Sequence, residues 1–132
     1  MKLDKLNYVD EAERVIKSLS KNQRTGAIEL TTSKIRNLLA MTSDIYNEVI
    51  HDNQEYLSEE ILGRVQYLRL RVVYESGQDN DKKINAVKDF VEKADIVSLI
   101  NGIGKSRGKL LLFCNYMEAL TAYHKYYGGR DN

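Results

Sequence analysis

The chain has 132 residues, a formal net charge of +1, one cysteine and no proline. This length predicts a single domain built around one hydrophobic core, and the lone Cys114 excludes an internal disulfide. Acidic residues interrupt the N-terminal stretch, and no apolar run approaches the roughly 18 residues of a membrane span, so we expect a cytoplasmic protein without a signal peptide. Average usage would give about six or seven prolines, and their absence favours long, uninterrupted helices.

Five segments carry apolar residues at helical spacing, and none alternates in the way of a half-buried strand. In the first segment, Val9, Ala12 and Ile16 follow one another at intervals of three and four residues. The sequence therefore predicts an all-α fold, a compact five-helix bundle in a single domain. The predicted helices span residues 4–20, 32–53, 58–76, 81–100 and 105–127.

Candidate capping residues mark where the later helices begin. Thr31 or Thr32 can cap the second helix and Ser58 the third, while the fifth begins at Lys105 or Ser106. The fifth helix is apolar on more than one side, which is typical of a central helix or of one at a subunit interface.

The charges are unevenly distributed along the chain, although they nearly cancel in the sum. One stretch contains six acidic residues and no lysine or arginine, and an earlier stretch contains four basic residues and one acid, Glu29. We therefore expect two surface patches of opposite sign. The acidic residues are Asp44, Glu48, Asp52, Glu55, Glu59 and Glu60, and the basic residues are Lys21, Arg24, Lys34 and Arg36.

A face of the third helix combines arginine with tyrosine. Arg64, Tyr67, Arg71 and Tyr74 are three, four and three residues apart, so they share one side. Guanidinium groups pair with phosphates, and tyrosine rings stack on unpaired bases, so this face is a candidate nucleic-acid surface. In the alternative interpretation the tyrosines pack into the edge of the core, while the arginines reach solvent or pair with nearby glutamates such as Glu75.

Two helix starts carry further cations. Lys34 and Arg36 lie in the opening turns of the second helix, where the dipole favours anions, so an external anion would explain them. Near the fifth helix, Lys105 and Arg107 accompany glycines that leave amides free for a phosphate. An ordinary solvated surface is the alternative at both places. Gly104-Lys105-Ser106 resembles the end of a nucleotide-binding loop, but the first glycine of that motif is missing.

The sequence predicts no catalytic centre, metal site or cofactor. Glu48 and His51 have the spacing of metal ligands in helical bundles, yet no second such pair exists in the chain. His124 lies among tyrosines, where a core or interface role is expected. Cys114 has no activating cation or histidine at helical spacing.

Three blocks of sequence resemble one known family, the small subunit of type III-A CRISPR-Cas effector complexes, the Csm complexes. The blocks are Leu30 to Arg36 (LTTSKIR), Val73 to Gly77 (VYESG) and Phe113 to Asp131 (FCNYMEALTAYHKYYGGRD). The resemblance implies a five-helix, non-catalytic protein that stacks in multiple copies. It also implies contact with the backbone and large subunits, and with the guide RNA–target RNA duplex, mainly on the target strand.

The resemblance also suggests which basic residues bind RNA. Three of them, Lys34, Arg36 and Arg130, lie inside the quoted blocks. Members of the family tend to have an arginine where this chain has Gln78, which weakens the case for a phosphate contact at that turn. The predicted RNA-binding residues are Lys34, Arg36, Arg64, Arg71, Lys105, Arg107 and Arg130.

Two other functions remain compatible with a basic helical protein. A DNA-binding regulator would present a recognition helix after a short turn and prefer duplex DNA. A protein-protein adaptor without nucleic-acid binding would use the tyrosine-rich fifth helix as its binding surface.

Overall fold

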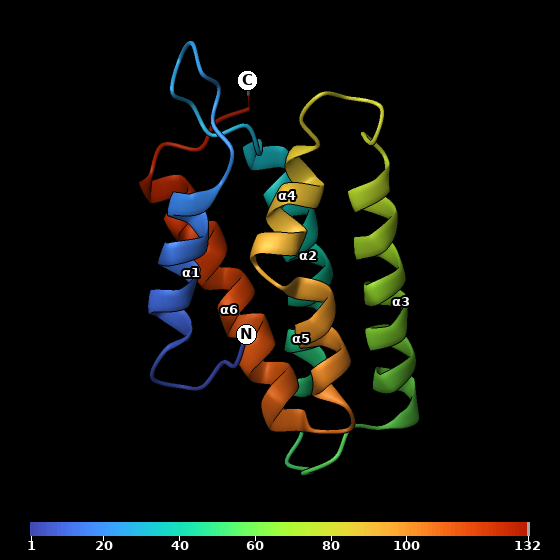
Figure 1. Cartoon of the computed structure of the whole chain (residues 1–132). Coiled ribbons are helices and arrows are strands. Elements are labelled where there is room, and N and C mark those ends of the chain that lie inside the picture. The colour runs from blue at the N-terminus through green and yellow to red at the C-terminus, as the bar shows by residue number, and fades with distance from the viewer. Residues whose placement is uncertain (132) are drawn as a thin grey trace.

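A computed structural model describes residues 1–131, and within them the chain forms six helices and no extended strand (Figure 1). The predicted all-α class is confirmed, whereas the predicted number of five helices is wrong. The helices are α1 (Tyr8–Ser18), α2 (Thr32–Val49), α3 (Glu59–Gly77), α4 (Ala86–Lys93), α5 (Ile96–Ile103) and α6 (Arg107–Tyr126).

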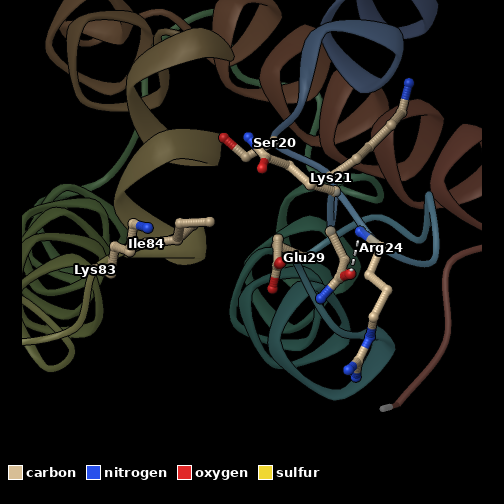
Figure 2. Close-up of a pocket in the computed structure, with 8 residues that line it drawn as sticks. Ser20, Lys21, Arg24, Glu29, Lys83 and Ile84 are labelled. Carbon is tan, nitrogen blue, oxygen red and sulfur yellow. Dashed lines mark hydrogen bonds between the residues drawn. The ribbon is translucent and has the colours of Figure 1, made fainter.

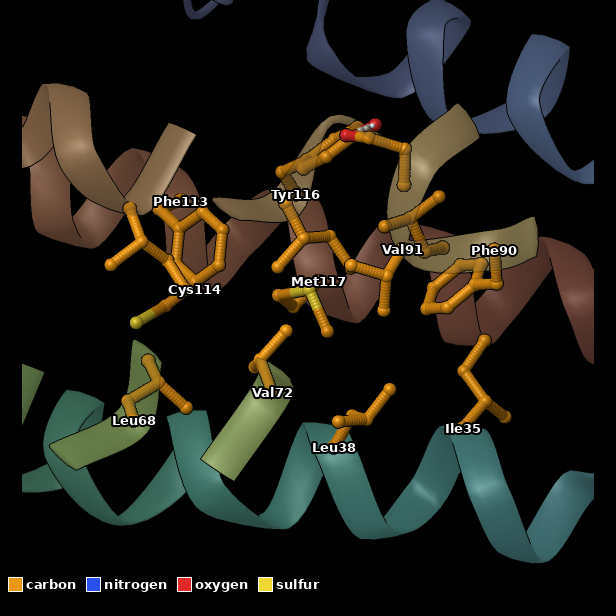
Figure 3. Packing of buried hydrophobic residues seen from close by; sticks show 14 of the residues in the cluster. Ile35, Leu38, Leu68, Val72, Phe90, Val91, Phe113, Cys114, Tyr116 and Met117 are labelled. Atoms are coloured by element: carbon orange, nitrogen blue, oxygen red, sulfur yellow. Dashed lines mark hydrogen bonds between the residues drawn. The ribbon is translucent and has the colours of Figure 1, made fainter. Parts of the chain in front are cut away.

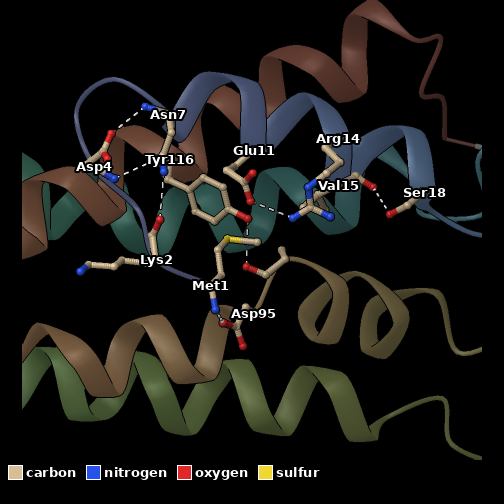
Figure 4. Close-up of polar contacts among 11 residues, drawn as sticks. Met1, Lys2, Asp4, Asn7, Glu11, Arg14, Val15, Ser18, Asp95 and Tyr116 are labelled. Carbon is tan, nitrogen blue, oxygen red and sulfur yellow. Dashed lines mark hydrogen bonds and ion pairs between the residues drawn. The ribbon is translucent and has the colours of Figure 1, made fainter.

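The extra helix arises because the predicted helix over residues 81–100 is broken at Asp95. This residue has a left-handed backbone, with φ 58° and ψ 36°, which aspartate tolerates better than most residues. At the break, the buried hydroxyl of Tyr116 donates to the carbonyl oxygen of Ala94 at 2.9 Å, and the ammonium group of Met1 pairs with the Asp95 carboxylate at 2.8 Å (Figure 4). The apolar pattern continues across the break, so sequence periodicity did not reveal it.

Side-chain caps fix where three other helices begin. Thr31, Ser58 and Ser106 each accept a hydrogen bond from the backbone amide three residues further on, at 3.3, 3.3 and 3.2 Å. The predicted cap at Ser58 is confirmed, and the open alternatives resolve to Thr31 for α2 and Ser106 for α6. These oxygens satisfy amides that the first turn of a helix leaves without partners.

The first helix begins at Tyr8, later than the predicted residue 4. The Asp4 carboxylate accepts hydrogen bonds from the amides of Leu6 and Asn7, both at 2.8 Å, and holds the preceding residues in a turn (Figure 4). α2 ends at Val49, four residues before the predicted residue 53.

α6 occupies the centre of the bundle and contacts α1, α2 and α5, so of the two expected positions, central or at a subunit interface, the fold shows the central one. Its inward side chains include Phe113, Tyr116 and Met117, which pack against Leu38 of α2 and Phe90 of α4 in one hydrophobic core (Figure 3). Each buried side chain of this size stabilises the fold by roughly 1.5–3 kcal/mol.

α1 and α3 form opposite edges of the bundle, with α2, α4, α5 and α6 between them (Figure 1). Because α2 and α3 run in opposite directions, the N-terminal end of α2 lies with the C-terminal end of α3. Among residues 1–131, no helix has the length and apolar character needed to cross a membrane.

Candidate nucleic-acid interface

The C-terminal tail folds back onto the first turn of α2. The amide of Thr32 donates to the carbonyl oxygen of Arg130 at 3.2 Å. Both the amide and the hydroxyl of Ser33 donate to one carboxylate oxygen of Asp131, at 2.8 and 2.6 Å. Two sequence blocks whose contacting residues are 98 positions apart therefore form one structural unit.

A buried histidine locks this tail in place. The Nε2 atom of His124 lies 2.7 Å from the carbonyl oxygen of Leu30, in the segment that leads into α2. The amide of Gly129 donates to the His124 carbonyl oxygen at 2.8 Å, and Gly128 turns the chain with a φ of 87°. His124 is 1% exposed. It therefore positions the tail from within the core, as expected of a structural histidine.

Three predicted RNA-binding residues come together at this end of α2. Lys34 and Arg36 project from its first two turns, and Arg130 is held beside them by the tail. Arg36 and Arg130 are exposed, and Lys34 is half-buried. None of the three forms an ion pair within residues 1–131. We call Lys34, Arg36 and Arg130 the α2 basic surface.

The sequence predicted an external anion at this helix start. The chain itself supplies a negative charge there, the carboxylate of Asp131. Hydrogen bonds from Ser33, chiefly from its hydroxyl, hold the pKa of Asp131 below its ordinary value, and Arg36 adds a smaller attraction. Asp131 thus stays ionised at neutral pH and complements the positive end of the α2 dipole. The sequence reasoning missed this contact, because nothing local in the tail indicates its partner.

A second basic feature lies at the same end of the bundle. An open groove of about 600 Å³ separates the α1–α2 loop from the loop that precedes α4 (Figure 2). Lys21, Arg24 and Lys83 line it together with one acid, Glu29. We call it the loop groove. Lys83 was not a predicted site residue, since only the folded chain brings it opposite Lys21.

The amides of Arg24 and Thr25 both donate to the side-chain oxygen of Asn22, at 2.9 and 3.0 Å. The resulting turn holds one wall of the loop groove in a fixed shape.

The two predicted arginines on α3 are engaged within the chain. Arg64 pairs with Glu48 of α2 at 2.5 Å, and Arg71 pairs with Glu75 at 2.9 Å. The Arg71 guanidinium also lies 5.0 Å from the centre of the Tyr74 ring. This face has two interpretations, a nucleic-acid surface or a surface whose arginines pair with nearby glutamates. The arginines agree in part with the second, because Arg71 pairs with Glu75. The tyrosines are exposed, so they are not packed into the core edge.

The junction between α5 and α6 lies at the opposite end of the bundle, beside the loop between α2 and α3 (Figure 1), and the backbones of Lys105 and Arg107 are hydrogen-bonded to that loop. The Arg107 guanidinium donates to the carbonyl oxygens of Val49 and Ile50, at 3.3 and 3.1 Å, where α2 ends. A cation there satisfies free carbonyls and complements the helix dipole, so Arg107 has a role in the fold. The Lys105 side chain is exposed, and its carbonyl oxygen accepts the amide of Leu57 at 2.9 Å.

The remaining candidates for metal binding, nucleotide binding and nucleophilic chemistry are Glu48, the segment before Gly104 and Cys114, and each is engaged in the fold. Glu48 pairs with an arginine, and residues 96–103 before Gly104 form a helix, whereas a nucleotide-binding loop requires a strand there. Burial raises the pKa of the Cys114 thiol to about 12, and its sulfur contacts the Thr42 carbonyl oxygen at 3.7 Å. A thiol in this state is a poor nucleophile.

Comparison with known proteins identifies the family. The model of the Csm2 Type III-A family matches residues 3–130. A Streptococcus thermophilus protein called CRISPR system Cms protein Csm2 is 45% identical over 125 residues, which cover 95% of this chain and 94% of the relative. Proteins of the same name are 42% identical in Mycobacterium tuberculosis, over the same fractions, and 34% identical in Enterococcus italicus, over 90% of this chain and 83% of that relative. The chain therefore belongs to the Csm2 type III-A family.

Proposed function

We propose that this protein is the non-catalytic small subunit of the type III-A CRISPR-Cas interference complex, the Csm complex. Family membership makes it a component of this system alongside the other Csm subunits. In the proposal, several copies stack along the channel that holds the guide RNA paired with target RNA, in the cytoplasm. Each copy contacts the RNA backbone and leaves catalysis to the backbone and large subunits.

The observation that carries the RNA contact is the α2 basic surface. Lys34 and Arg36 lie in the first turns of α2, and the carbonyl oxygen of Arg130 accepts the Thr32 amide at the same helix start, so the three cations lie at one end of the bundle, with Arg36 and Arg130 exposed and Lys34 half-buried. Lysine and arginine contacts to phosphate give affinity without sequence preference. Such contacts suit a subunit of a guided complex, because base pairing with the guide already supplies the specificity.

The other predicted basic residues take different roles in this proposal. Arg107 supports the end of α2, and Arg64 and Arg71 are paired within the chain, so they contribute less to RNA affinity than the α2 basic surface does. Lys105 remains an exposed cation at the other end, where it supplies a second phosphate contact once copies stack.

Opposite charges at the two ends of the bundle support head-to-tail stacking. The loop groove is basic, whereas the end formed by the α2–α3 loop carries Asp52, Glu55, Glu59 and Glu60. We call these four residues the acidic end. A groove of one copy that receives the acidic end of the next makes a heterologous contact that does not close, which builds a filament.

The test is binding of target RNA to the complex reconstituted with a triple variant, Lys34→Gln, Arg36→Gln and Arg130→Gln. A matched triple, Lys2→Gln, Lys5→Gln and Lys109→Gln, removes the same charge from exposed positions elsewhere. We expect only the first variant to weaken binding, and the slope of log affinity against log salt to fall by about one unit per lost phosphate contact. Equal affinity and slope for the two triples, in complexes of unchanged subunit content, would overturn the assignment.

A further inference from the structure

The outward face of α3 carries an apolar stripe that the rest of the chain does not cover. Five residues recur along it at alternating intervals of four and three, Gly63, Tyr67, Leu70, Tyr74 and Gly77. The side chains of Tyr67 and Leu70 are each 62% exposed and that of Tyr74 is 54% exposed. Alternating intervals of four and three produce the straight seam by which one helix packs on another. We call these five residues the α3 seam.

The seam is separate from the face that α3 buries in its own bundle. Ile61, Val65, Leu68 and Val72 form that buried face, and they lie on the opposite side of the helix. α3 therefore has two apolar faces, one used within the fold and one turned to solvent at the edge of the bundle (Figure 1).

Gly63 gives a second reason to expect a partner on this face. A glycine inside an exposed helix costs about 1 kcal/mol relative to alanine. A Cβ atom at Gly63 would meet nothing within 4 Å, so the chain's own packing does not require glycine there. Close approach of another backbone is the usual reason for such a residue.

The order of residues in the seam points to a second copy of this chain as the partner. Glycine, tyrosine, leucine, tyrosine and glycine read the same in both directions along the helix. Two such helices in antiparallel orientation bring Leu70 against Leu70 of the second copy, each Tyr67 near the other Tyr74, and each Gly63 near the other Gly77. A patch that complements itself under a two-fold axis is what a symmetric dimer requires.

The two arginines beside the seam do not oppose this contact. Arg64 and Arg71 flank it, and each already forms an ion pair with a glutamate of its own chain, Glu48 and Glu75. Two copies can therefore meet without burying an uncompensated charge.

Since a tyrosine contributes roughly 150–250 Å² when buried, pairing two seams covers on the order of 1,000 Å², which lies at the lower limit for a specific interface. The dimer is accordingly weak.

We propose that the free protein forms a weak, symmetric, antiparallel dimer through the α3 seam. This contact differs from head-to-tail stacking, because it is closed and involves neither the loop groove nor the acidic end. It also does not depend on RNA.

Oxidative cross-linking tests the geometry directly. Leu70 lies at the proposed two-fold axis, so Leu70→Cys should form a disulfide-linked dimer, and the buried Cys114 should not compete. Ala122→Cys places a thiol at an exposed position on α6 as the control. We expect cross-linking at position 70 at least tenfold faster than at position 122. Equal rates at the two positions would overturn the proposal.

Sedimentation equilibrium supplies a measurement that does not depend on cysteine chemistry. The wild-type mass should rise above the monomer value of 15.2 kDa as concentration increases, whereas Leu70→Glu should remain monomeric with an unchanged helical circular dichroism spectrum. A wild-type chain that stays monomeric up to the millimolar range would refute the dimer. If instead Leu70→Glu self-associated as strongly as the wild type but bound RNA more weakly, the seam would be an RNA surface and the proposal would be wrong.

Discussion

The backbone of Gly129 lies directly against the imidazole ring of His124, so closely that a Cβ atom on Gly129 would overlap the ring. The ring has little freedom to move, because it is buried and its Nε2 atom bonds the Leu30 carbonyl oxygen. We expect Gly129→Ala to reduce the free energy of unfolding by about 1–3 kcal/mol, the usual cost of overpacking. Urea denaturation followed by circular dichroism measures this loss.

Gly102→Ala is the control for that variant. Gly102 lies in α5, whereas Gly129 follows the end of α6, and a Cβ atom on Gly102 would meet nothing within 4 Å. Alanine at this position should be neutral or stabilising by up to about 1 kcal/mol. Equal stabilities for the two variants would mean that the tail is not held by His124.

A second prediction concerns the pH response of the tail. Hydrogen bonds from Ser33 lower the pKa of Asp131 in the folded state. The contact therefore contributes to stability above the ordinary aspartate pKa, near 3.9, and this contribution is lost as pH falls through the lower folded-state value. Carboxyl titration by NMR should show the Asp131 pKa move part of the way back toward the ordinary value in Ser33→Ala, since the hydroxyl that contributes most is removed while the backbone amide remains. An identical titration in the variant would refute the contact.

Local chemistry made part of this structure predictable. Ser58 caps α3 where the sequence indicated, because a cap and its amide are neighbours in the chain. The sequence did not predict the break at Asp95, because the groups that bond to the chain there belong to Met1 and Tyr116, which are distant in sequence.

The candidate site likewise combines residues that local sequence predicts with an arrangement that only distant contacts create. Lys34 and Arg36 were identified from their place at a helix start, and Arg130 from its sequence block. Their convergence depends on a contact between Ser33 and Asp131 across 98 positions, which no local pattern encodes. For the same reason the sequence did not indicate that Lys83 would face Lys21.

The structural role of Arg107 leads to a third prediction. Its guanidinium donates to two carbonyl oxygens at the end of α2, so Arg107→Ala should reduce the free energy of unfolding by about 1–2 kcal/mol. Arg107→Lys keeps the charge but loses the forked geometry, and an intermediate loss is expected. Lys105→Ala, at a neighbouring exposed position, should change stability by less than about 0.5 kcal/mol. If Arg107→Ala were as stable as Lys105→Ala, the arginine would be available for RNA after all.

The last prediction tests the junction between α4 and α5. The Tyr116 side chain is fully buried, and burial raises its pKa, so its hydroxyl remains a donor to the Ala94 carbonyl oxygen at physiological pH. Tyr116→Phe keeps the ring and leaves that oxygen without its donor, which should cost about 1–3 kcal/mol. Tyr126→Phe removes a hydroxyl from a ring that is 76% exposed and should change stability by less than about 0.5 kcal/mol. Urea midpoints for both variants, at an unchanged denaturant dependence, give the comparison. Equal midpoints would show that the hydroxyl does not hold the broken helix in place.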